Sequence, residues 1–200
     1  MKIYIIRHGE TTSDVEKRYG GDYDDHLTEK GMNQSRQLAD KLRGKGIQII
    51  YHSSRIRATE TAHILGNVLG AELKAVDDIR ERNNYGILTG MLKSEALKKY
   101  PEEAEKLMAD NLHHNVKGSE NYESFKRRIM SAFGGILSDD SHETIAIISH
   151  SGPISCFVRE YLKLGEFKHI GDCGFLEIEK NNKRLSIISL DNASLEQEHF

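Results

Sequence analysis

Two basic side chains that are suited to phosphoryl chemistry lie next to each other near the N-terminus, at Arg7 and His8. They follow directly on the apolar run 3–6, which is typical of a buried β-strand. Ligands of open α/β sheets bind beyond the carboxyl ends of the strands. A neutral imidazole can act as a nucleophile, and a neighbouring guanidinium can hold a phosphate group through paired hydrogen bonds. The pair therefore predicts a phosphate-binding site at this strand end.

The same arrangement recurs at two further strand-like runs. Run 47–51 is followed by Arg57, and run 144–148 is followed by His150. A helical pattern comes next in each case, so the strands are expected to be parallel and to end at one edge of one sheet. Basic side chains gathered in this way form a pocket for a phosphoryl group. The pocket would be lined by Arg7, His8, Arg57 and His150.

Length and composition fit a compact enzyme. The 200 residues suit one domain, and 38% hydrophobic residues can build its core. The net charge of −3 gives no general attraction to nucleic acid or to an anionic membrane. The chain has no apolar run long enough for a membrane span, and its first residues enter a strand, which leaves no room for a signal peptide. We therefore expect a cytoplasmic protein whose partner is a small phosphorylated substrate; its oligomeric state stays open.

Strand-like and helix-like segments alternate along the chain. Helices are expected to begin at Thr28 and at Pro101, and another is expected to end at Gly70. Such alternation predicts an α/β fold, a three-layer sandwich with a mostly parallel central sheet and helices on both faces. Runs 175–179 and 185–190 predict an antiparallel C-terminal edge hairpin. We expect a single domain over 1–200 with a lid-like helical insertion around 82–125. A helix that begins at Pro153 is expected after the last parallel strand. Its inward-facing residues would be Ile154, Phe157, Val158 and Tyr161.

Five consecutive residues, Arg7-His8-Gly9-Glu10-Thr11, resemble the signature of the histidine phosphatase superfamily, the phosphoglycerate-mutase-like proteins. Segments 18–31, 53–62, 81–90 and 149–152 resemble further motifs of this family and occur in the same order. Together they extend from residue 1 to about 160. The last 40 residues fit the fold without a signature.

The resemblance implies a mechanism of two steps. His8 would attack phosphorus and form a phosphohistidine, while Arg7, Arg57 and His150 would hold the phosphate oxygens. Glu81 would protonate the leaving oxygen and later deprotonate water, with Glu10 as the alternative acid. No metal or cofactor is required, and His113-His114 lack the spacing of zinc ligands. The further candidates are Asp14 and Ser151 for phosphate binding, and Arg82, Tyr85 and Gly21 for substrate binding.

Two of these candidates depart from the family pattern. Asp14 stands where the family commonly has an asparagine that contacts phosphate, and Ser151 replaces a frequent glycine. The Asp14 carboxylate is expected either to face the pocket, where it would repel phosphate, or to pair with a cation such as Arg18.

The resemblance leaves several functions open. The phosphatase branch is favoured, because mutases of the family are usually longer and enclose the phosphorylated ligand. A phosphoglycerate mutase is the first alternative. A phosphatase of phosphohistidine proteins is a second, although such proteins are usually smaller and lack the acidic loop around Glu81. An inactive relative that binds phosphoesters is a third.

Overall fold

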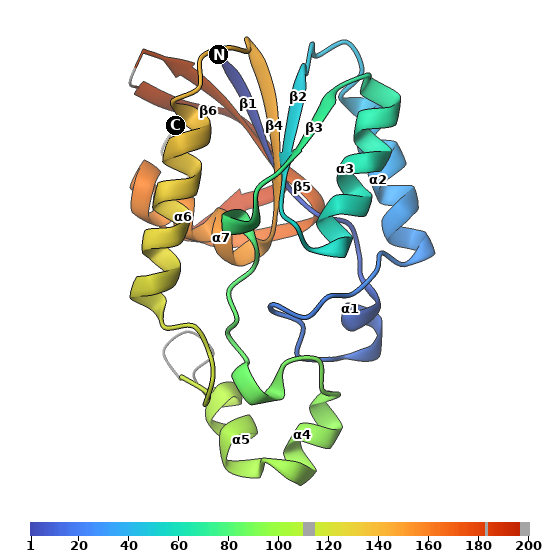
Figure 1. Ribbon diagram of the computed structural model, residues 1–200, viewed down its shortest axis with the longest axis vertical. Coiled ribbons are helices and arrows are strands. Elements are labelled where there is room, and N and C mark those ends of the chain that lie inside the picture. The colour runs from blue at the N-terminus through green and yellow to red at the C-terminus, as the bar shows by residue number, and fades with distance from the viewer. Residues whose placement is uncertain (110–114, 183, 197–200) are drawn as a thin grey trace.

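The computed structural model describes residues 1–109, 115–182 and 184–196 (Figure 1). Within these residues six strands form one sheet with the order β3-β2-β4-β1-β5-β6. The first four strands in this order are parallel, and β5 and β6 are antiparallel. The strands are β1 (Lys2–Arg7), β2 (Ile49–His52), β3 (Glu72–Ala75), β4 (Thr144–Ser149), β5 (Phe167–Asn181) and β6 (Arg184–Leu195).

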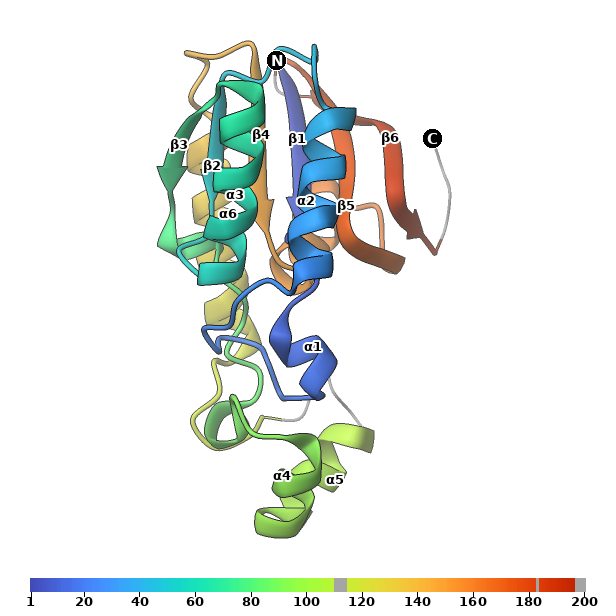
Figure 2. The same cartoon turned by 90° about the vertical axis from the view of Figure 1, so that its right-hand side faces the viewer.

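Helices cover both faces of the sheet, as Figures 1 and 2 show. One face is covered by α2 (Glu29–Lys41) and α3 (Ile56–Leu69), the other by α6 (Tyr122–Leu137) and α7 (Ser151–Cys156). The predicted α/β fold with a mostly parallel sheet and antiparallel C-terminal strands is confirmed.

The two central strands, β1 and β4, are buried on both faces. In β1, Ile3 and Ile5 belong to the apolar cluster that includes α6 and α7, whereas Tyr4 and Ile6 belong to the cluster that includes α2 and α3. This double burial explains the uninterrupted apolar runs in the sequence. Arg7 is level with Ser149 in the register of these strands, so both strands end at the same height. The residues that follow them are therefore neighbours.

Most helix ends lie where the sequence predicts them. The Thr28 side chain accepts a hydrogen bond from the Gly31 amide and caps α2, Gly70 ends α3, and α5 (Pro101–Ala109) begins at its proline. Two details of the helix after β4 were wrong. Pro153 is its third residue, since the helix begins at Ser151, and Tyr161 is 40% exposed. The exposure of Tyr161 is due to a π-helical segment, η3 (Phe157–Leu162), which changes the residue spacing. Pro153 still lies in the first turn of the helix, where backbone N–H groups have no partner within the helix.

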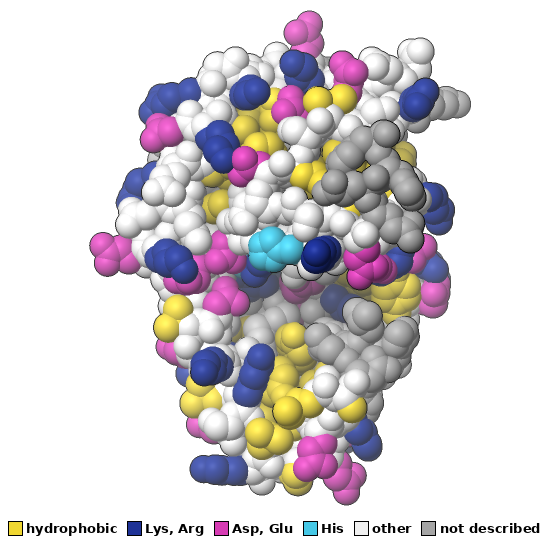
Figure 3. All heavy atoms as spheres, turned by 180° about the vertical axis from the view of Figure 1, so that it is seen from behind, with side chains coloured by type: hydrophobic (Ala, Val, Ile, Leu, Met, Phe, Trp, Pro, Cys, Tyr) yellow, Lys and Arg dark blue, Asp and Glu magenta, His cyan; other side chains and the backbone are white. Residues whose placement is uncertain are grey.

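The chain between β3 and α6 extends beyond the carboxyl end of the sheet, beside α1 (Thr12–Glu16) (Figure 2). It contains η1 (Asp77–Ile79), η2 (Gly86–Leu88), α4 (Lys93–Lys99) and α5. Its apolar residues pack around Tyr19, which follows α1, and form a small separate core with it: Leu88, Ala96, Ala104, Leu107 and Val116. Apolar side chains also gather on the back surface of this part of the molecule (Figure 3). Most of this segment falls in the insertion expected at 82–125, whereas η1 precedes it. Residues 110–114, including His113 and His114, lie outside the described residues.

The C-terminal hairpin begins earlier than the predicted residue 175. Strand β5 already starts at Phe167 and contains a bulge at 171–174, which faces Asn192 of β6. Gly171 and Gly174 interrupt the apolar alternation there, which is why the sequence pattern indicated only the later half of the strand. Among the described residues no helix combines the length and the apolar character that a bilayer span requires.

Candidate active site

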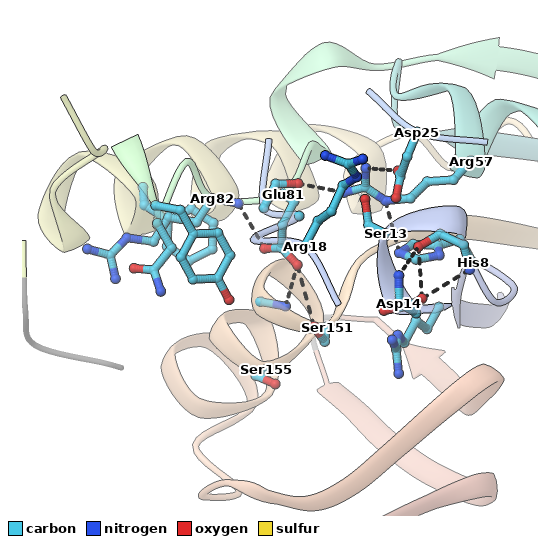
Figure 4. A pocket seen from close by; sticks show the side chains of 18 of the residues that line it. His8, Ser13, Asp14, Arg18, Asp25, Arg57, Glu81, Arg82, Ser151 and Ser155 are labelled. Atoms are coloured by element: carbon cyan, nitrogen blue, oxygen red, sulfur yellow. Dashed lines mark hydrogen bonds and ion pairs between the residues drawn. The ribbon is translucent and has the colours of Figure 1, made fainter. Parts of the chain in front are cut away.

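A cavity of about 740 Å³ lies at the carboxyl ends of β1 and β4 (Figure 4). The candidate site residues line it, with two exceptions: the alternative acid Glu10, and His150, which is fully buried beside Arg57. His8 follows β1, Arg57 lies in the first turn of α3, and Glu81 follows η1. The structure therefore brings the predicted residues together from distant parts of the chain.

His8 is held in one tautomer by its neighbours. Its ring atom Nδ1 lies 2.8 Å from the carbonyl oxygen of Gly9 and donates a hydrogen bond to it. The other ring nitrogen, Nε2, accepts a hydrogen bond of 3.1 Å from Nε of Arg57. Nε2 is therefore unprotonated, which is the state that a nucleophile needs.

The same N–H group of Arg57 also reaches His150. Nε of Arg57 lies 3.2 Å from Nδ1 of His150, so this nitrogen is an acceptor as well. The proton of His150 is then on Nε2, which donates to Oγ of Ser53 at 2.8 Å. One guanidinium N–H thus sets the tautomers of both histidines.

Both histidines are neutral in this site. Burial lowers the pKa of His8 well below its usual range, and the positive charges of Arg57 and Arg7 lower it further. Burial likewise lowers the pKa of His150, again with a contribution from Arg57. His8 is therefore a free base over the physiological pH range.

The guanidinium of Arg57 is fixed by the loop before α2. Its NH1 group donates to the Asp25 carboxylate and to the carbonyl of Tyr23, and its NH2 group donates to the carbonyl of Gly21. Gly21, a candidate for substrate binding, thus contributes its backbone to this network. Asp25 was missed in the sequence, because an acidic residue in a charged loop is usually solvated.

Arg7 is fixed from the opposite side by β5. NH1 donates to the carbonyl of Ile170 at 2.8 Å, and NH2 lies 3.2 Å from Oδ1 of Asp172. Nε of Arg7 and Oγ of Ser13 are buried without a hydrogen-bond partner among the described residues, and both residues line the cavity. Buried donors in such positions are suited to the oxygens of a bound phosphate. Ser13 was not among the predicted residues.

The Glu81 carboxyl group lies against the first turn of α7. It accepts hydrogen bonds from the amides of Arg82 at 2.8 Å and Gly152 at 3.2 Å. A Cβ atom on Gly152 would lie 2.2 Å from Oε1 of Glu81, so only glycine allows this approach. Burial raises the pKa of Glu81, which favours the protonated form that a general acid needs. Glu10, the alternative acid, instead bonds Thr28 and Lys30 and is not part of the cavity lining.

Asp14 and Ser151, the two departures from the family pattern, both line the cavity. Oδ2 of Asp14 accepts hydrogen bonds from the amide and the hydroxyl of Thr11. The Thr11 hydroxyl oxygen in turn accepts from the Asp14 amide, which completes the capping box of α1. Arg18 pairs with Glu16 and not with Asp14. The Ser151 hydroxyl lies 3.5 Å from Oε2 of Glu81.

The remaining candidates form the wall beyond Glu81. Arg82 donates from Nε to the carbonyl of Glu120 at 2.9 Å. The ring of Tyr85 packs on Gly21, since a Cβ there would lie 2.9 Å from Cδ2 of the tyrosine. Gly21 also has a positive φ of 53°, which favours glycine.

A polar cluster that the sequence did not indicate completes this wall. The Tyr122 hydroxyl donates to Glu160 at 2.8 Å and accepts from Arg159, which also pairs with Glu160 and Glu166. All four residues line the cavity. They come from α6, η3 and the loop that follows, and only the tertiary structure brings them together.

The chain resembles known proteins of one superfamily. The model of the histidine phosphatase superfamily (branch 1) matches residues 3–193. Phosphoserine phosphatase 1 of Hydrogenobacter thermophilus is 27% identical over 154 residues, which are 77% of this chain and 72% of that protein. A protein of Salmonella paratyphi B named as a probable phosphoglycerate mutase is 27% identical over 168 residues, 82% of this chain and 76% of its own.

Solved structures agree with the fold. The α-ribazole phosphatase of Shigella flexneri superposes with a TM-score of 0.83 at 20% identity, over 97% of this chain and 98% of that one. A phosphoglycerate mutase of Bacillus anthracis superposes with a TM-score of 0.80 at 20% identity, over 94% and 92% of the two chains. At this identity the likeness shows the shared fold.

Proposed function

This chain belongs to the histidine phosphatase superfamily, and on that basis we propose that it is a metal-independent phosphomonoesterase of the phosphatase branch. It hydrolyses a small phosphorylated metabolite through a phosphohistidine on His8. The observation that supports this most strongly is the contact between Nε of Arg57 and Nε2 of His8, because it keeps a buried imidazole nitrogen unprotonated in the cavity wall.

In the first step Nε2 of His8 attacks phosphorus. The new N–P bond forms as the bond from phosphorus to the leaving oxygen breaks, and that oxygen takes the proton of Glu81. As the phosphate enters, the N–H of Arg57 moves from His8 to a phosphate oxygen and frees the lone pair. The Nε–H of Arg7 and the hydroxyl of Ser13, which have no partner among the described residues, donate to other phosphate oxygens.

In the second step water replaces the imidazole. Glu81, now a carboxylate, accepts a proton from water, and the water oxygen attacks phosphorus. The N–P bond breaks, its electrons return to His8, and inorganic phosphate leaves. Glu81 is then protonated again, so the residues are ready for another cycle.

His150 supports both steps by taking up a proton from solvent. Its Nδ1 accepts a hydrogen bond from Nε of Arg57, and burial keeps its pKa low. An entering phosphate dianion favours the charged form of a nearby imidazole. Nδ1 then becomes a donor to a phosphate oxygen.

The proposal requires no metal ion, because the side chains of Arg7 and Arg57 supply the positive charge that the transition state needs. The described residues contain no cluster of His, Cys, Asp or Glu that could hold an ion. The cavity of about 740 Å³ is of the size that small-molecule ligands occupy. The proposal includes a cytoplasmic location and no nucleic-acid or membrane partner.

A panel of phosphorylated metabolites tests this function. It should include phosphoserine, phosphoglycerate, α-ribazole phosphate and the aryl ester p-nitrophenyl phosphate, each with and without EDTA. We expect release of inorganic phosphate from at least one metabolite, unchanged by EDTA. Interconversion of phosphoglycerates without phosphate release would identify a mutase instead. Binding of phosphate without turnover of any member would identify an inactive relative.

A further inference from the structure

The bulge in β5 lies directly beside Arg7 and His8, the two cavity residues at the end of β1. Ile170 pairs with Ala193 and Phe175 with Asp191, so residues 171–174 together face the single residue Asn192. A bulge of this kind bends its strand and redirects side chains, and bulges are frequent next to active sites. This one lies beyond residues 149–152, the last of the short motifs that resemble the family.

Close packing against Asn192 holds the bulge in shape. A Cβ atom on Gly171 would lie 2.3 Å from Nδ2 of Asn192, and one on Gly174 would lie 2.6 Å from its carbonyl oxygen. Nδ2 of Asn192 donates to the carbonyl of Asp172 at 3.0 Å. Cys173 and Asn192 both have left-handed backbones, with φ of 55° and 49°. Unfavourable conformations of this kind persist only where the surroundings enforce them.

Two hydrogen bonds and one ion pair connect the bulge region to Arg7 and His8. The Arg7 guanidinium contacts the carbonyl of Ile170 at 2.8 Å and the carboxylate of Asp172 at 3.2 Å. The amide of Cys173 donates to the carbonyl of His8 at 3.1 Å. The region therefore holds the side chain of Arg7 and the backbone of His8 at the same time.

These contacts leave the Nε–H group of Arg7 available to bind phosphate. Arginine has five N–H groups. In Arg7, NH1 donates to the carbonyl of Ile170, and NH2 forms an ion pair with Asp172. The Nε–H stays buried without a partner among the described residues. A guanidinium that is already oriented loses less side-chain entropy when it binds phosphate.

We propose that the bulge at 171–174 positions Arg7 and His8 for catalysis, with Asp172 as a positioning residue that acts through Arg7. This inference rests on the proposed phosphatase function. Asp172 is not expected to contact the substrate, because it does not line the cavity and its carboxylate would repel a phosphate group.

The variant Asp172→Ala tests the inference against a matched control in the same hairpin. Asp191→Ala removes an equal charge from β6, where Asp191 pairs with Lys41 at the surface. We expect Asp172→Ala to lower kcat/KM for p-nitrophenyl phosphate about 10- to 100-fold, since small displacements of a catalytic group cost up to about 10²-fold. Asp172→Asn should retain more activity, because its amide oxygen can still accept from Arg7. Asp191→Ala should stay within about twofold of the wild type.

A double-mutant cycle separates positioning from a general structural role. If Asp172 acts through Arg7, Asp172→Ala should have almost no further effect in an Arg7→Ala background. If Asp172→Ala lowers kcat/KM by the same factor in the Arg7→Ala background as in the wild type, the inference is wrong. Equal activities of Asp172→Ala and Asp191→Ala would also overturn it. Should Asp172→Ala fail to fold, Asp172→Asn takes its place in the cycle.

Failure of the proposed function would be recognised separately, as absence of turnover in the wild type. The affinity for vanadate, measured by calorimetry on the same variants, then replaces kcat/KM. The positioning role would be supported if Asp172→Ala binds vanadate more weakly than Asp191→Ala does and if this difference disappears in the Arg7→Ala background. Equal affinities of the two single variants would refute it.

Discussion

Oδ1 of Asp25 lies 2.7 Å from NH1 of Arg57, and the two side chains are almost completely buried, with 2% and 5% of their surface exposed. Arg57 also sets the tautomers of His8 and His150. Removing one partner of a buried pair leaves the other charge without compensation. Asp25 therefore couples the stability of the fold to the order of the active site.

We predict that Asp25→Ala lowers the free energy of unfolding by about 3–5 kcal/mol, the usual loss when a buried ion pair is broken. The matched control is Asp40→Ala, since Asp40 pairs with Arg43 and both side chains are well exposed. That pair should contribute about 0–1 kcal/mol. Urea unfolding of both variants measures the difference. Equal losses of unfolding free energy in the two variants would show that the buried Asp25–Arg57 pair stabilises the fold no more than the exposed pair does.

The pKa values of the two histidines test the electrostatic role of Arg57. Its positive charge disfavours a second positive charge nearby and so lowers the pKa of His8 and of His150. Arg57→Gln should therefore raise the pKa values of His8 and His150. It is combined with Asp25→Asn, so that no buried carboxylate is left unpaired. NMR titration of the imidazole signals measures the shifts, with Arg43→Gln as the surface control. Unchanged values would mean that burial alone depresses them.

Glu81→Gln should affect alkyl phosphates far more than p-nitrophenyl phosphate. A general acid matters most when the leaving oxygen is a strong base, and its contribution is about 10²–10⁴-fold. In the wild type, the rate with alkyl phosphates should fall as the pH rises through the raised pKa of Glu81, because the acid form is lost. Glu10→Gln is the control. Equal rate losses for both substrate types would place the acid role elsewhere.

The role of Asp14 can be decided by vanadate inhibition. Asp14→Asn keeps an oxygen that can accept from Thr11 and changes only the charge. If the carboxylate repels the bound anion, this variant should bind vanadate more tightly, by on the order of 1 kcal/mol at an effective dielectric near 20. The neighbouring Ser13→Ala should bind it more weakly, because a donor is removed. If Asp14→Asn binds vanadate with unchanged or weaker affinity, the role of Asp14 is limited to capping α1.

The sequence predicted the parts of the site that depend on strand ends. Arg7, His8 and His150 follow central strands whose apolar runs are easily recognised, and parallel strands bring their ends together. Glu81 follows no such rule and was identified through the family resemblance alone.

Residues that act through tertiary contacts were missed for a physical reason. Asp25 and Asp172 are acidic residues next to glycine, aspartate or cysteine, a context that is as common in solvated loops as in buried pairs. Their importance comes from Arg57 and Arg7, which lie 32 and more than 160 positions away in the sequence. The π-helical segment that exposes Tyr161 is likewise decided by packing and has no pattern of its own.

Trapping of a phosphoenzyme tests the central claim, that His8 is the nucleophile. Rapid acid-free quenching with a ³²P-labelled substrate, followed by peptide mapping, should locate the label on the peptide that contains His8. The linkage should be stable to base and labile to acid. His8→Ala should show no label and no turnover while its unfolding stays close to that of the wild type, because His8 lies at a strand end in the cavity wall. Label on another residue, or most of the activity retained in His8→Ala, would contradict the account.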